Sequence, residues 1–307
     1  MFKPLLAALA LFAAGPAHPV KIIPGAIPED RQPDGNTVIF EDAKGLIVVD
    51  TGRHKEHQAA ILDYARSRGK PIVAIVNTHW HLDHSGGNQE LRAVFPDAKL
   101  YTSTAIEGAL GGFLSAGRGR ERLKDSRLSA NERTDIALGV EAIEDRKDLI
   151  PDVPVTGDTR IGRLELHLAP FAATQGDTWL YDPESRTLVA GDLVVIPVPF
   201  FDTACAAGWR KALDALAAQP FERLVPGHGP ALDRPEFEAY RSAFANLVDC
   251  AAGAADKAQC VAGWQRDAAQ FLTTARDRTM SAEYLGYYID NILREPGKQA
   301  QLCSRAP

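Results

Sequence analysis

The 307-residue sequence contains only four cysteines, and none of them forms a C-x-x-C pair, so a catalytic thiol is not expected. Basic residues are also scarce, since 34 Lys and Arg stand against 40 Asp and Glu and give a formal net charge of −6. Nucleic-acid binding needs a basic stripe. The one Arg-rich segment, 118–122, is followed by acidic residues, so nucleic acid is not an expected partner. Low-complexity tracts and short-period repeats are absent, which excludes a repeat architecture.

Long apolar runs are missing after the first residues of the chain. Residues 1–17 combine a positively charged start, a short apolar core and small residues with plausible cleavage after Ala14 or Ala17. This pattern is typical of a secretory signal peptide. The apolar core is too short to span a bilayer of about 30 Å. We therefore expect a periplasmic or secreted protein with no integral membrane segment after signal cleavage.

The four cysteines form an even set, which permits disulfides in an exported chain. Cys250 and Cys260 flank an Ala- and Gly-rich segment and are the first choice for a bridge. That choice leaves Cys205 to pair with Cys303. Three pairings are formally possible, and the sequence alone does not decide among them.

The most informative segment is Asn77–His84, NTHWHLDH, which places three imidazoles and one carboxylate within six consecutive positions. His79 and His81 alternate, so their side chains point the same way on an extended segment. Imidazole and carboxylate are donors that Zn²⁺ favours. The segment follows the apolar run Ile72–Val76, a predicted buried strand, and precedes a predicted helix that ends at Phe95. Open α/β sheets commonly bind ligands at such strand ends.

This motif resembles that of the metallo-β-lactamase superfamily of metallohydrolases. The similarity extends from about Gly35 to about Pro230. Asp50–Gly52 resembles the Asp-Thr-Gly turn after the family's opening hairpin. Ala190–Asp192 resembles the strand end that supplies a metal-bridging Asp, and Pro226–Gly229 resembles the loop that supplies the last His. The motifs occur in the family's order, and the last two follow apolar strands.

The resemblance implies an α/β fold, a four-layered αββα metallo-β-lactamase sandwich with a C-terminal helical extension. It divides the chain into a signal peptide (1–17), a metallo-β-lactamase-like domain (18–234) and a helical extension packed on that domain (235–307). Helices are expected at 54–68, 105–139, 235–248, 264–276 and 281–294, with Ser281 as the N-cap of the last.

The family's metal donors carry over to six residues of this chain: His79 and His81 for a first site, Asp83, His84 and His228 for a second, and Asp192 as a bridge. The implied cofactor is Zn²⁺, which lowers the pKa of bound water from about 15.7 toward about 7. Metal-bound hydroxide would attack the ester, thioester or amide/lactam carbonyl of a small-molecule substrate, and the catalytic residue Asp83 would orient the water. The metal would also stabilise the oxyanion that forms.

One position departs from the family's pattern. Family members usually carry a further His in a stretch like P-G-H-T-P-G-D, and counting back from Gly176 and Asp177 places Ala173 at that position. Three interpretations stay open. The chain is a hydrolase with one zinc ion, mainly at the second site; or a two-metal enzyme with a substitute donor such as Gln175; or a non-catalytic periplasmic accessory protein that binds metal or ligand. One ion per chain is favoured. His167 is expected to be an ordinary strand residue.

A second similarity concerns the segment after the bridging Asp. Residues Pro197–Asp202 (PVPFFD) and the tail Tyr287–Leu293 (YYIDNIL) resemble exported zinc hydrolases associated with quinoprotein and sulfur-compound oxidation. Because one fold hosts many hydrolytic reactions, these similarities do not identify the natural substrate.

Overall fold

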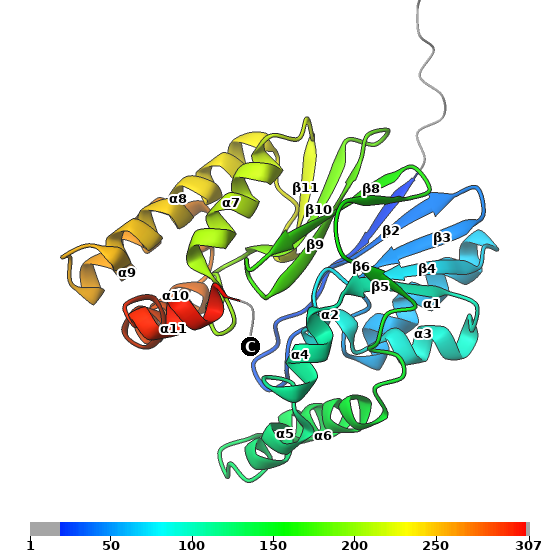
Figure 1. Cartoon of the computed structure of the whole chain (residues 1–307), viewed down its shortest axis with the longest axis horizontal. Coiled ribbons are helices and arrows are strands. Elements are labelled where there is room, and N and C mark those ends of the chain that lie inside the picture. Colours follow the sequence, from blue (N-terminus) through cyan, green and yellow to red (C-terminus); the bar gives the residue numbers. More distant parts are fainter. Residues whose placement is uncertain (1–18, 305–307) are drawn as a thin grey trace, which may run out of the picture.

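The computed structural model describes residues 19–304, and the predicted signal peptide lies outside them. Two β-sheets lie face to face, with helices on their outer sides (Figure 1). The first sheet has the order β1 (Val20–Ile23), β2 (Thr37–Asp42), β3 (Gly45–Val49), β4 (Ile72–Val76), β5 (Lys99–Ser103) and β6 (Val153–Val155). The second has the order β11 (Arg223–His228), β10 (Thr187–Val195), β9 (Gly176–Asp182), β8 (Leu164–Pro170) and β7 (Thr159–Ile161).

Three apolar clusters separate four layers. Neighbouring residues of β2 point into two different clusters. Phe40 enters the core between the sheets, whereas Ile39 faces the helices outside the first sheet. Across the inter-sheet core, Leu180 and Val189 come from the second sheet. The helices outside the first sheet are α1 (Lys55–Arg68) and α3 (Asn88–Val94), and those outside the second include α7 (Ala206–Ala217) and α8 (Arg234–Ala252). The predicted αββα sandwich is therefore confirmed.

A helical insert lies between β5 and β6. It contains α4 (Ala105–Gly111), α5 (Ala116–Arg122) and α6 (Ala130–Asp145), so the predicted helical segment is confirmed and continues to residue 145. His54, the N-cap residue of α1, ties this insert to the main domain. Its Nδ1 lies 2.7 Å from Asp34 Oδ2, and its Nε2 lies 3.1 Å from Asp135 Oδ2 on α6.

The contribution of the His54 contacts to the stability of the protein should depend on pH. Burial on its own would lower the pKa of His54, but the hydrogen bonds to Asp34 and Asp135 outweigh burial and raise the pKa above 6.5. The stabilisation is therefore complete below about pH 6.5 and is lost as the pH rises through the folded-state pKa. We expect His54→Gln to lower Tm by about 2–5 °C at pH 6, and by less at pH 9.

Thermal melts followed by circular dichroism at the two pH values test this prediction. His167→Gln is the control, because His167 lies on β8 and its Nδ1 faces the exposed carboxylate of Asp158 at 3.0 Å, away from the insert. An equal loss of Tm at pH 6 and pH 9 for His54→Gln would contradict the proposed role of the charge.

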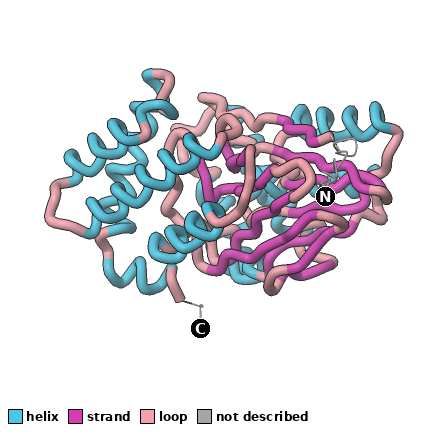
Figure 2. Tube along the Cα trace, turned by 90° about the horizontal axis from the view of Figure 1, so that it is seen from above, coloured by secondary structure: helices cyan, strands magenta, loops and turns pink. Residues whose placement is uncertain are grey.

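The chain after residue 234 is helical (Figure 2). It shares an apolar core with the second sheet. Its further helices are α9 (Lys257–Asp267), α10 (Ala275–Tyr288) and α11 (Pro296–Leu302), with a 3₁₀ turn at Ala269–Phe271 and a π-helical segment at Ile289–Leu293. Tyr240 on α8 connects this region to the strand that carries Asp192, since its hydroxyl accepts a hydrogen bond from Val195 N at 3.1 Å.

Two helix predictions in this region are wrong. The predicted helix 264–276 is broken, because α9 ends at Asp267 and a new helix begins at Ala275. The side chain of Thr274 accepts a hydrogen bond from Asp277 N and the side chain of Asp277 accepts one from Thr274 N, so this capping box starts α10. Ser281 is therefore no N-cap; it is buried within α10 and donates its hydroxyl to Arg278 O.

Both predicted disulfides are confirmed. Cys250–Cys260 links α8 to α9, and Cys205–Cys303 links the N-cap of α7 to the end of α11. The second bridge ties the C-terminal tail to the segment that follows Asp192. Within residues 19–304, the helices are all too short or too polar to cross a bilayer.

Candidate metal centre

The histidine motif follows β4 of the first sheet and lies next to the second sheet. β4 ends at Val76, and the chain then continues to the short helix α2 (Leu82–Ser85). Asp83 and His84 therefore lie on a helical turn, and both are buried. His81 is the N-cap residue of α2. The second sheet supplies Asp192 from within β10 and His228 from the last position of β11, and these two strands are parallel neighbours.

The six predicted metal donors form two groups. Within each group, one donor atom of every residue lies within 4.8 Å of the others. The first group is His79, His81 and Asp192, and the second is Asp83, His84 and His228. These residues come from three separate segments of the chain, so the convergence predicted from the sequence is present.

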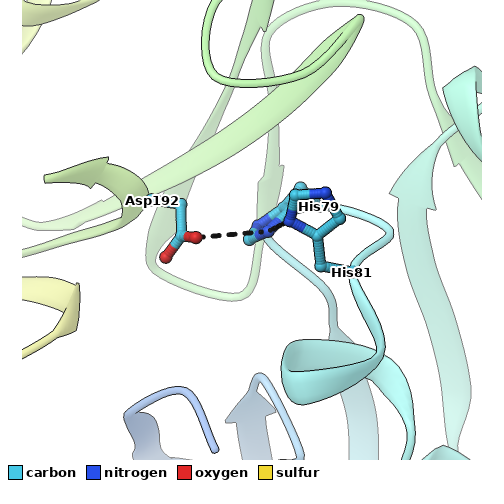
Figure 3. Close-up of side chains that lie close together, drawn as sticks. All are labelled: His79, His81 and Asp192. Carbon is cyan, nitrogen blue, oxygen red and sulfur yellow. Dashed lines mark hydrogen bonds and ion pairs between the residues drawn. The ribbon is translucent and has the colours of Figure 1, made fainter. Parts of the chain in front are cut away.

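The atoms of the first group face one another across a short gap (Figure 3). His79 Nε2 lies 2.9 Å from His81 Nδ1 and 3.5 Å from Asp192 Oδ2. No fourth His, Cys, Asp or Glu within residues 19–304 joins this group. Ala173 is buried in the loop between β8 and β9, where its carbonyl accepts the Thr203 hydroxyl at 2.9 Å.

The second group is equally compact and is adjacent to the first. His228 Nε2 lies 3.1 Å from Asp83 Oδ2 and 3.2 Å from His84 Nε2. Asp192 Oδ1 lies 3.2 Å from His84 Nε2 and 3.7 Å from His228 Nε2. Asp192 therefore presents one oxygen to each group, as a bridging carboxylate does.

The charges around His84 favour a cation. Asp50, Asp83 and Asp192 each place an oxygen within 3.6 Å of its ring nitrogens. Burial alone would lower the pKa of His84, but these carboxylates outweigh burial and raise the pKa well above the usual value. Burial and the neighbouring His84 instead lower the pKa of His79, which favours a neutral imidazole with one unprotonated nitrogen. A protonated His84 balances only one of three buried carboxylates, and buried charges require partners.

An unsatisfied polar atom of Asp192 also fits a metal. In the described part of the chain, Asp192 Oδ1, which faces the second group, is buried without a hydrogen-bond partner. Because buried polar atoms are normally hydrogen-bonded, an atom without a partner is suited to bind an ion or a water molecule. Imidazole and carboxylate donors that converge without thiolates suit zinc.

Asp50 orients His84 of the second group through the ring nitrogen that faces away from Asp192. The sequence did not predict this role. Its carboxylate accepts hydrogen bonds from Thr78 N at 2.7 Å and Thr78 Oγ1 at 2.8 Å, and it lies 2.8 Å from His84 Nδ1. A carboxylate on the far nitrogen of an imidazole is typical of metal-binding histidines. Asp50 also has a φ of 60°, an unusual conformation for a non-glycine residue. The sequence signals were its place in the Asp-Thr-Gly turn and its position directly after an apolar strand.

His167 belongs to neither group. Its ring stacks on Trp179 at a centroid distance of 4.0 Å, and its Nδ1 lies 3.0 Å from Asp158. The prediction that it is an ordinary strand residue is confirmed.

Two glycines allow the backbone to approach the donors closely. A Cβ atom on Gly227 would overlap Asp192 Oδ1, and one on Gly35 would overlap the His84 ring. These positions therefore exclude any side chain while the donors keep their places.

Gly227→Ala should displace Asp192 without removing a donor. We expect zinc affinity to fall by about 10- to 100-fold, the size of effect seen when the support of a ligand is lost. Competition with a fluorescent chelator measures the affinity. Gly108→Ala is the control, because a Cβ atom there meets open space. Unchanged affinity in Gly227→Ala would show that Asp192 does not need its observed position.

Comparisons with known proteins agree with this geometry. Residues 31–228, close to two thirds of the chain, match the family profile described as the metallo-beta-lactamase superfamily. The linear primary-alkylsulfatase of Pseudomonas sp. is 27% identical over 226 residues, which are 65% of this chain and 42% of that protein. The hydroxyacylglutathione hydrolase of Synechococcus sp. is 46% identical over 52 residues, which are 17% of this chain and 21% of that protein. The chain thus spans less than half the length of either relative.

Solved structures share the fold. A metallo-β-lactamase from Hirschia baltica superposes with a TM-score of 0.52 at 17% identity and covers 73% of this chain and 97% of that chain. A stereoselective inverting sec-alkylsulfatase from Pseudomonas sp. has a TM-score of 0.56 at 19% identity and covers 89% of this chain and 50% of that chain. The second match is long enough to extend into the C-terminal helices.

Proposed function

The chain belongs to the metallo-β-lactamase superfamily, and we propose that it is a zinc-dependent hydrolase of an ester, thioester or amide/lactam carbonyl. One observation carries this proposal: two groups of buried imidazoles and carboxylates converge and are joined by Asp192. Such a cluster is costly to bury without a cation. A purely structural role does not explain why its donor atoms face one another.

The second group would hold the stronger zinc site. Together with Asp192 it offers four protein donors, more than the three that a catalytic zinc site needs beside a water molecule: Asp83, His84, Asp192 and His228. The first group offers three, because Ala173 stands where the family usually has a His. We therefore propose one firmly held zinc ion per chain. A bound zinc ion supplies a Lewis acid and lowers the pKa of a coordinated water to about 7.

The protein's own residues would position the reactants. Although burial opposes ionisation, His84 and His228 hold the pKa of Asp83 well below its usual range. Asp83 Oδ2 faces His228 and His84, which leaves Oδ1 to accept a hydrogen bond from the attacking water. Asp50 keeps the His84 ring oriented, so that its other nitrogen faces Asp192. We propose Asp83 as the residue that orients the water.

Two disulfides support export to an oxidising compartment, because such bridges are rare in the reducing cytosol of most organisms. We propose a periplasmic or secreted enzyme on this basis.

The experiment that tests the function compares zinc-loaded and chelated protein on a substrate panel. The panel contains an aryl ester, an acyl thioester, a β-lactam and an alkyl sulfate, the last because of the similarity to alkylsulfatases. We expect turnover of a carbonyl substrate that stops with chelator and returns with zinc. Tightly bound zinc without turnover of any substrate would instead favour the accessory-protein interpretation. Turnover that persists after the metal is removed would contradict the proposed chemistry.

A further inference from the structure

Arg53 follows the Asp50–Gly52 turn directly, and its backbone is held firmly. Its N–H donates to Asp34 Oδ1 at 2.6 Å, and its carbonyl accepts from Gln58 Nε2 at 2.9 Å. The start of this side chain is therefore fixed beside α2, the helix that carries Asp83 and His84.

Within the described residues, the Arg53 guanidinium has no hydrogen-bond or ion-pair partner. Its Nε is covered from solvent and has no hydrogen-bond acceptor within residues 19–304. No carboxylate of the described chain forms an ion pair with it either. The residue as a whole is partly exposed. An Arg in such a position is unusual, since a buried charge normally has a partner.

The carboxylates whose charges act on Arg53 are Asp34, Asp83 and Asp135, and all are engaged in other contacts. Asp34 accepts from two backbone N–H groups and faces His54. Asp135 accepts from Gln32 N at 3.0 Å and also faces His54. Asp83 belongs to the second donor group. None of the three is free to turn to the guanidinium without losing these contacts.

A second cation reinforces the local positive potential. Arg122, at the end of α5 in the helical insert, lies close enough to oppose the charge of Arg53. Burial and Arg122 lower the pKa of Arg53 even though the three carboxylates act in the opposite direction. Two like charges beside an acidic metal centre are tolerated best when an anion joins them.

We propose that Arg53 binds a carboxylate carried by the substrate, next to the second donor group. This inference rests on the proposed hydrolase function and narrows it to ester, thioester or amide substrates that are themselves anions. The planar guanidinium can donate two parallel hydrogen bonds to a carboxylate, which a neutral substrate cannot accept in the same way.

The test compares two aryl esters, neutral 4-nitrophenyl acetate and anionic mono-4-nitrophenyl succinate, in the zinc-loaded protein. We expect the wild type to prefer the anionic ester. Arg53→Gln should raise KM for that ester by about 10- to 100-fold and change kcat/KM for the neutral ester by less than about threefold. Arg53→Lys keeps the charge but loses the planar guanidinium. Its KM for the anionic ester should therefore lie between those of the wild type and Arg53→Gln. Arg120→Gln is the control, because Arg120 is an exposed Arg on the helical insert and pairs with Glu144.

A binding readout separates this inference from the proposed function. Succinate should raise the Tm of the wild type more than neutral succinamide does, and Arg53→Gln should remove most of that difference while keeping its zinc. If no ester is turned over but this difference is present and lost in the variant, the anion site stands and the hydrolase proposal fails. The opposite result is also informative. If esters are turned over but Arg53→Gln has the wild-type kinetic constants for both esters and the wild-type Tm shifts with succinate and succinamide, the anion site is wrong and the hydrolase proposal stands. A Tm of Arg53→Gln without ligand that falls by more than about 5 °C would indicate a structural role and overturn the inference.

Discussion

Asp192→Ala is expected to remove zinc from the protein and to lower kcat/KM by at least about 10³-fold. Asp192 contacts both donor groups, with Oδ2 at 3.5 Å from His79 and Oδ1 at 3.2 Å from His84. Its removal leaves several buried imidazoles facing one another without their shared carboxylate. Losing one partner of a buried charged pair costs about 3–5 kcal/mol, which is on the order of a 10³-fold change in affinity.

His79→Ala is the informative comparison for this variant. It removes a donor from the first group only and leaves four candidate donors in place: Asp83, His84, Asp192 and His228. We expect its zinc content to stay near that of the wild type. Metal analysis by mass spectrometry, with circular dichroism as a check on folding, measures the difference. Equal zinc loss in the two variants would contradict the dominance of the second group.

Ala173→His is expected to create a second firm zinc site. The substitution would add the imidazole that the first group lacks by comparison with the family. Zinc sites with four protein ligands bind with about 10–16 kcal/mol, so one ligand corresponds to about 3 kcal/mol and to an affinity gain on the order of 10²-fold. Titration with zinc, monitored by a competing chelator, should then give two equivalents per chain.

Two further variants control this experiment. Ala173→Asn adds a side chain of similar polarity but a poor zinc donor, so it should bind no additional zinc. The double variant Ala173→His with His79→Ala should lose the gain again, because both changes act on one site. A gain that survives in the double variant would mean that the new imidazole binds zinc elsewhere.

The sequence predicted those elements that depend on local pattern. The strand Ile72–Val76 was correct at both ends, because it is a continuous apolar run covered on both faces. The helix boundaries after residue 264 were wrong, because helix-forming residues continue through the break. There the reciprocal hydrogen bonds of Thr274 and Asp277 decide where α10 begins.

The candidate site also contains residues that the sequence predicted and residues that it did not. The convergence of the six candidate donors could be predicted because each lies in a recognisable motif. The functions of Asp50, Gly227 and Arg53 could not, because they depend on contacts between distant segments. Asp50 meets His84 34 positions later, and Gly227 makes room for Asp192 35 positions earlier. Only the folded chain brings these pairs together.

Anomalous diffraction at the zinc absorption edge, on crystals of the zinc-loaded protein, tests the central claim most directly. We predict one strong peak among Asp83, His84, Asp192 and His228, and at most a weak peak beside His79 and His81. No peak at the second group, or two peaks of equal height, would contradict the account of one complete and one depleted site.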